Sequence, residues 1–143
     1  MSHDANLFVG VAELLDTEGI GTYAPDTVLP ADVTGIVLGK SPDGPDRVLG
    51  LTPYPVADDD STDSVTGIQA RMRWGTDATG LVALADSVFN VLHNRRDFRL
   101  RGVWVEISWR QSQAWIGQDT RGRMELVSNY YFRTVRSGPH LID

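Results

Sequence analysis

The chain has 143 residues, 41% of them hydrophobic and 22% charged, with a formal net charge of −6 and no cysteine. This length suits a single domain spanning residues 1–143, because a chain of this size buries about 68–70% of its unfolded surface. The lack of cysteine excludes disulfides, thiol nucleophiles and thiolate metal sites, and the negative charge disfavours a nucleic-acid-binding protein. No apolar run approaches the ~20 residues of a membrane span, and the first residues carry no basic, apolar leader, so we expect neither a membrane partner nor secretion.

Two amphipathic helices are predicted, over residues 4–19 and 77–94. In each, apolar residues recur every three or four positions and form one stripe that can face a core. The first stripe contains Leu7, Phe8, Val11, Leu14 and Leu15; the second contains Leu81, Leu84, Ala85, Val88 and Leu92. Asp4 or Asn6 can cap the first helix, and Thr76 or Asp77 can cap the second.

Alternating or β-branched residues predict five strands, over residues 34–40, 47–54, 65–75, 103–111 and 124–136. Turn residues at 41–46 favour a hairpin between the first two strands, and residues 117–123 form a second turn. The alternation within residues 65–75 places the apolar side chains on one face and those of Gln69, Arg71 and Arg73 on the other. We therefore expect an α+β fold, in which two helices pack on one face of a mostly antiparallel sheet.

Charge is unevenly distributed along the chain. An acidic segment at 56–64 contains Asp58, Asp59, Asp60 and Asp63, and a basic segment at 93–102 contains Arg95, Arg96, Arg99 and Arg101. Separate patches of opposite sign allow one copy to bind the next head to tail and to close a ring. We expect the loop from Pro53 to Ser64 to be mobile in a free subunit, since it is long, acidic and flanked by prolines, and to become ordered on assembly.

The long strands carry large residues on both faces. Trp104, Tyr131 and Arg133 occupy the face that would otherwise meet solvent, and this composition is typical of a protein–protein interface. The alternative is that these side chains simply lie on a solvated sheet surface.

Three patterns that would indicate chemistry fail on their spacing. The segment "GIVLGKS" has Thr34 where a phosphate-binding loop needs its first glycine. The acidic segment has Asp63 and Gln69 where a calcium loop needs glycine and glutamate. The histidines are too far apart in sequence to suggest a metal site, at positions 3, 93 and 140. We therefore expect no catalytic set, no cofactor and no metal.

Several segments, taken in order, carry a resemblance to a known family. They are "PDRVLGLTPYP" at 45–55, "DSVTGIQARMR" at 63–73, "ADSVFNVLH" at 85–93, "GQDTRGR" at 117–123 and "NYYF" at 129–132. Together they resemble the tail terminators, which are minor capsid or tail-completion proteins of long-tailed phages, in the type common among phages of actinobacteria. The resemblance covers residues 5–136.

The resemblance implies a structural virion protein at the head–tail junction, assembled in the host cytoplasm. Such proteins form a ring, usually a homohexamer, on the last ring of the tail tube, where they end tube growth and offer a docking surface to a head-side stopper or connector protein. DNA passes through the lumen without specific binding. Two alternatives remain open: a head-completion or stopper protein, and a small-molecule-binding or enzymatic α+β domain.

Overall fold

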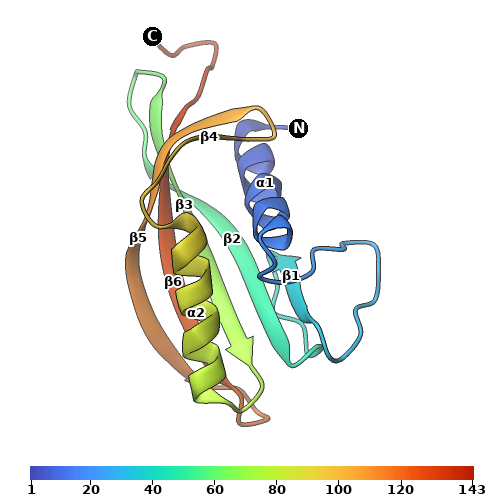
Figure 1. Ribbon diagram of the computed structural model, residues 1–143. Coiled ribbons are helices and arrows are strands. Elements are labelled where there is room, and N and C mark those ends of the chain that lie inside the picture. The colour runs from blue at the N-terminus through green and yellow to red at the C-terminus, as the bar shows by residue number, and fades with distance from the viewer.

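The computed structural model describes residues 1–143 as two helices packed on one face of a six-stranded sheet (Figure 1). The elements in chain order are α1 (His3–Thr17), β1 (Thr34–Leu38), β2 (Arg47–Ala57), β3 (Asp63–Trp74), α2 (Ala78–Leu92), β4 (Arg95–Leu100), β5 (Val103–Gln118) and β6 (Met124–Val135). The strand order across the sheet is β1-β2-β3-β6-β5-β4, and every pair except β1–β2 is antiparallel. The predicted α+β fold is therefore confirmed.

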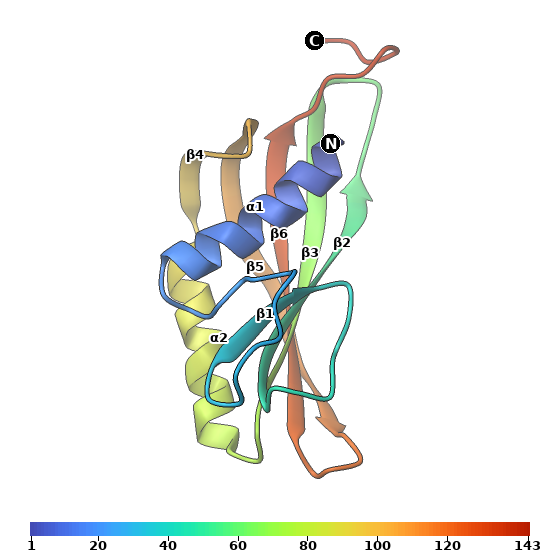
Figure 2. The same ribbon diagram turned by 90° about the vertical axis from the view of Figure 1, so that its right-hand side faces the viewer.

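The core lies between the helices and the sheet, where 21 buried apolar residues form one cluster. Both predicted stripes supply it: Leu7 and Leu15 of α1 and Leu81 and Val88 of α2 are at most 1% exposed. Such burial stabilises the fold by about 1.5–3 kcal/mol for each large side chain. Figure 2 shows that α1 crosses the strands obliquely, whereas α2 runs along them.

The helix caps agree with the sequence only in part. Asp77 caps α2, since its carboxylate accepts from the backbone N–H of Gly80 at 3.0 Å, as expected. The cap of α1 is Ser2, whose hydroxyl accepts from Ala5 N at 3.2 Å, so the predicted caps Asp4 and Asn6 are wrong. Each lies one or more residues inside the helix.

The predicted hairpin between the first two strands is wrong, because β1 and β2 are parallel. Thr34 at the start of β1 pairs with Arg47 at the start of β2, so the chain must return along the whole length of β1 before β2 begins. Residues 39–46 make this return as an extended connection rather than a tight reversal. The guanidinium of the buried Arg73 donates to carbonyl groups of this connection and holds it in this path.

Residues 95–100, predicted as a basic segment without strand structure, form the edge strand β4. It pairs with β5 through the two-residue turn Arg101–Gly102, in which both residues have positive φ (48° and 82°), as a primed hairpin turn requires. β5 is also longer than predicted and continues to Gln118. Its register against β6 shifts at three places, and β5 curves along its length (Figure 1).

The acidic loop is shorter than predicted. Pro53–Ala57 belongs to β2 and pairs with β3, which leaves residues 58–62 as the connection. This connection is bound by the C-terminal segment: Thr62 N donates to Ile142 O at 3.0 Å, and Ile142 N donates to Asp60 O at 2.7 Å. Backbone hydrogen bonds therefore hold the tip of the β2–β3 hairpin.

Candidate subunit and partner interface

The predicted acidic residues lie together at the tip of the β2–β3 hairpin. Asp59 accepts from the backbone N–H and the hydroxyl of Ser61, both at 2.7 Å, and these hydrogen bonds lower the pKa of the Asp59 carboxyl. Asp58 accepts from the Ser64 hydroxyl at 3.0 Å. Hydrogen bonds therefore orient the carboxylates of Asp58 and Asp59 at the tip.

One acidic residue of this group already has a partner in its own chain. The Asp63 carboxylate lies 3.7 Å from the Arg133 guanidinium, and both side chains are about half exposed. An exposed pair of this kind contributes at most about 1 kcal/mol, so another charged surface can replace it at little cost.

The four predicted arginines of the basic segment lie on or just after β4, and each touches a neighbour. Arg99 stacks over Trp104, with 5.1 Å from guanidinium to ring centre, so these two candidate residues form one unit on the β4–β5 hairpin. Arg101 is paired with Glu13 at 3.2 Å. The two others have weaker contacts: Arg95 is 4.0 Å from Glu18 and stacks over Phe98, and Arg96 donates to Asn94.

The sheet face without helices carries an aromatic group around Tyr131. Trp109 packs edge-to-face on Tyr131, with 5.7 Å between ring centres. The Tyr54 ring lies over Gly67, where any side chain would collide with it, and its hydroxyl donates to Asn129 at 2.9 Å. Partial burial, and then the nearby Tyr131, raise the pKa of Tyr54. Trp109 and Tyr54 were not among the predicted site residues.

Tyr54 could have been found from sequence only through the register of β2 and β3. Tyr54 pairs with Gly67 across the two strands, and an aromatic ring often covers a cross-strand glycine. The predicted strand 47–54 ended at this residue, so no such pair was considered.

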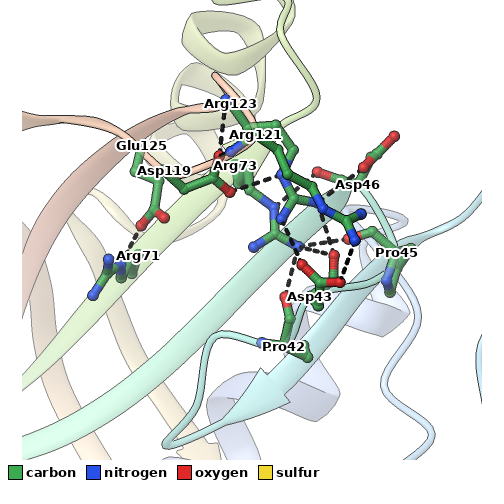
Figure 3. A network of polar contacts seen from close by, with 10 residues as sticks. All are labelled: Pro42, Asp43, Pro45, Asp46, Arg71, Arg73, Asp119, Arg121, Arg123 and Glu125. Carbon is green, nitrogen blue, oxygen red and sulfur yellow. Dashed lines mark hydrogen bonds and ion pairs between the residues drawn. The ribbon is translucent and has the colours of Figure 1, made fainter.

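Two buried arginines hold the opposite end of the molecule together (Figure 3). Arg73 is only 3% exposed, although it alternates with the apolar side chains of β3. Its guanidinium donates to four carbonyl oxygens of the β1–β2 connection, those of Pro42, Asp43, Pro45 and Asp46. This contact fixes the path of the connection.

Arg123, at 4% exposure, joins the β5–β6 turn to the same connection. It donates to Asp119 at 2.8 Å, to Asp46 at 2.9 Å and to the Asp43 carbonyl at 2.7 Å. Desolvation by itself would lower the pKa of Arg123, but the carboxylates of Asp119 and Asp46 raise it. We call Arg73, Arg123 and the groups that they bind the arginine clamp.

The three carboxylates that pair with the arginine clamp differ in their exposure to solvent. Some desolvation acts to raise the pKa of Asp119, but hydrogen bonds from Arg123 and Arg121 outweigh it and lower that pKa. Asp43 and Asp46 are far more exposed, at 70% and 67% of their side chains. Asp119 is therefore the carboxylate most closely bound to the clamp.

The structure contains no group of three or more histidine, aspartate or glutamate side chains arranged to hold a metal ion. None of its helices combines the length and the apolar composition that spanning a bilayer requires.

The fold and these surfaces define a small α+β protein with exposed aromatic and charged groups suited to contacts with other protein. The chain belongs to the bacteriophage tail terminator protein family, whose family model matches residues 14–136. It is therefore a structural protein of a phage tail, and the resemblance found in the sequence is confirmed at the level of this family. Among curated proteins, no sequence is similar enough to count as a match.

One solved structure shows the same fold at low sequence identity. A chain from the virion of a native gene transfer agent particle is 13% identical, with a TM-score of 0.58 over 94% of this chain and 95% of that chain. A second solved structure, 14% identical with a TM-score of 0.46 over 72% of this chain and 80% of that chain, is too distant to establish a common fold.

Proposed function

We propose that this protein forms a ring that caps the head-proximal end of the phage tail tube. The ring ends tube growth and gives the head-side connector a surface to dock on. Membership of the tail terminator family is the observation that carries this proposal. The similarity to a chain of a gene transfer agent virion supports the same location, in a particle, and a structural rather than catalytic role.

The ring would contain several copies of one domain spanning residues 1–143, six in the number that the family resemblance implies. Its contacts would use the acidic tip of one copy and the arginines of β4 in the next, together with the aromatic group around Tyr131. Arg96 is best placed for such a contact, because its one side-chain hydrogen bond is to a neutral group, Asn94.

DNA would pass through the lumen of this ring without being bound. Each copy brings a formal charge of −6, and like charges repel phosphates within a Debye length of about 8 Å at physiological salt. The lumen wall would be acidic or neutral, supplied by part of residues 57–63 or 117–125. For residues 57–63 we rank the subunit contact above the lumen. A structure of the assembled ring in which several unpaired arginines line the channel would contradict this assignment.

Sedimentation with two kinds of particle tests the proposal. Preformed tail tubes and connector-bearing heads, purified separately, are each mixed with the protein and pelleted. A terminator pellets with tubes, whereas a stopper protein pellets with heads alone. Binding to neither would leave the alternative of a small-molecule-binding or enzymatic domain and would overturn the proposal.

A further inference from the structure

An apolar pocket of about 570 Å³ lies at the β1 edge of the sheet, between residues 22–33 and the β1–β2 connection. Leu29, Ile36 and Leu38 line it, and Lys40 is the one charged residue in its wall. Val28 contributes to the lining yet is 95% exposed. The volume lies within the range of about 300–1,000 Å³ that is typical of binding pockets.

The part of the pocket wall that belongs to the β1–β2 connection is held in place before anything binds. Pro42 and Pro45 line it, and their carbonyl oxygens each accept from Arg73 at 2.7 Å. Because the arginine clamp fixes this segment, an occupant need not order it on binding.

Toward the opposite edge of the sheet, β5 carries an exposed apolar pair, Trp115 and Ile116, at 49% and 50% exposure. Ile116 has no partner in the β5–β6 register, which shifts between Trp115 and Gly117. The pair lies in the half of β5 that extends beyond β4, since β4 pairs with β5 only over residues 103–108. The outer edge of residues 109–118 therefore has no neighbouring strand.

The outer edge of β4 is protected against pairing with another strand, whereas the outer edges of β1 and of residues 109–118 in β5 are not. β4 carries three arginines and a positive φ at Asp97 (53°), features that discourage another strand from pairing. The outer edge of β1 is bridged by Thr22, whose N–H donates to Thr34 O at 2.8 Å and whose carbonyl accepts from Ile36 N at 2.9 Å, and it has no neighbouring strand. An apolar pocket thus lies beside one open edge, and an exposed apolar pair lies on the other.

We propose that the pocket beside β1 receives Trp115 and Ile116 from a second copy of this chain. The occupant is a second copy because the chain itself supplies the complementary apolar pair, on the one other sheet edge left unprotected. Since the two surfaces differ, the contact is heterologous and leaves each copy with one free pocket and one free pair, so it repeats from copy to copy. The inference rests on the proposed ring and assigns its subunit contact.

Cysteine pairs test this contact, because the chain has no native cysteine. V28C and I116C, made in separate proteins, are mixed and treated with a short bismaleimide, both free in solution and on tail tubes. The control partner is V135C. Val135 is about as exposed as Ile116, at 49%. It lies nine residues along β6 from Leu126, the residue that pairs with Trp115, and is therefore roughly 30 Å from the apolar pair. We expect the V28C–I116C product to exceed the V28C–V135C product in at least one setting, and equal yields in both settings would overturn the inference.

A second variant measures how much the pair contributes. W115S should weaken self-association by about 10- to 30-fold, as loss of a central tryptophan does at an interface, whereas V135S should not change it. An unchanged association constant for W115S would contradict the inference. Protein that pellets with tubes but gives no specific V28C–I116C product refutes this contact alone, whereas failure to bind tubes refutes the proposed function.

Discussion

Arg123 illustrates how a single residue can be structural although it lies in a sequence of turn residues. The side chain is 5% exposed and faces three carboxylates from two separate segments. A charge buried in this way is stabilising only while its partners are present, because an unpaired buried ion costs several kcal/mol. Its removal leaves polar groups on both segments without partners.

Replacement of Arg123 by alanine is expected to lower the free energy of unfolding by about 2–3 kcal/mol, since several charge-assisted hydrogen bonds are lost. Arg121 provides the matched control. It also pairs with Asp43, at 2.7 Å, but its side chain is 61% exposed, so R121A should change stability by less than about 0.5 kcal/mol. Urea denaturation of both variants measures the difference, and equal effects would mean that the clamp does not act as described.

Asp119 should make the stability of the arginine clamp pH-dependent. Its pKa is lowered in the folded protein, so its stabilisation is fully present above the unfolded pKa, about 3.9, and is lost as the pH falls through the lower folded value. D119N should therefore be less stable than the parent at pH 7, and the gap should narrow below about pH 4. Thermal unfolding between pH 3 and 7 checks this, and a gap that stayed constant over the range would refute it.

At the level of elements, hydrophobic periodicity predicted the helices and strands whose formation depends on the local sequence. Both helices and the inner strands were found because their buried residues recur at the helical or strand period. The β1–β2 pairing could not be predicted in this way. Its geometry depends on Arg73, which comes from a third strand, and nothing in the local turn sequence distinguishes the extended return from a hairpin.

The interface residues were predicted only in part, because composition indicates where charge is concentrated but not which strand carries it. The composition of the acidic and basic segments located both charged groups, but β4 was missed because its arginines obscured a short edge strand. The Arg101–Gly102 turn was the available signal. The residues that line the pocket beside β1 all lie between positions 23 and 45, but the pocket is formed by the path of the two connections that flank β1, and no periodic pattern in the sequence indicates that path.

The C-terminal segment and the acidic tip are expected to order each other. Removal of residues 137–143 deletes the groups that bind Thr62 N and Asp60 O, so amide exchange at Thr62 should become much faster. The amide of Ile68, within β3, should keep its protection. Hydrogen exchange on full-length and truncated protein compares them, and a Thr62 amide that exchanges at the same rate in both would show that the tail does not hold the tip.

At the scale of the whole molecule, the opposite charges of the acidic tip and of β4, which lie at the same end of the sheet, should guide assembly of one copy against the next. R96E is expected to weaken self-association or tube binding, most strongly at low salt, where exposed charges are least screened. R121E makes the same change in net charge at the other end of the sheet and should have little effect. Sedimentation at two salt concentrations measures both variants. If R96E and R121E behave alike at both, the proposed pairing of β4 with the acidic tip is wrong.

Electron microscopy of growing tail tubes tests the central claim most directly. Tube protein is polymerised with and without this protein, and tube lengths and tube ends are compared. We predict shorter tubes, each with one additional ring of density at a single end, because a terminator binds the growing end and stops further addition. Unchanged lengths together with bare ends would contradict the assignment of this protein as the cap of the tail tube.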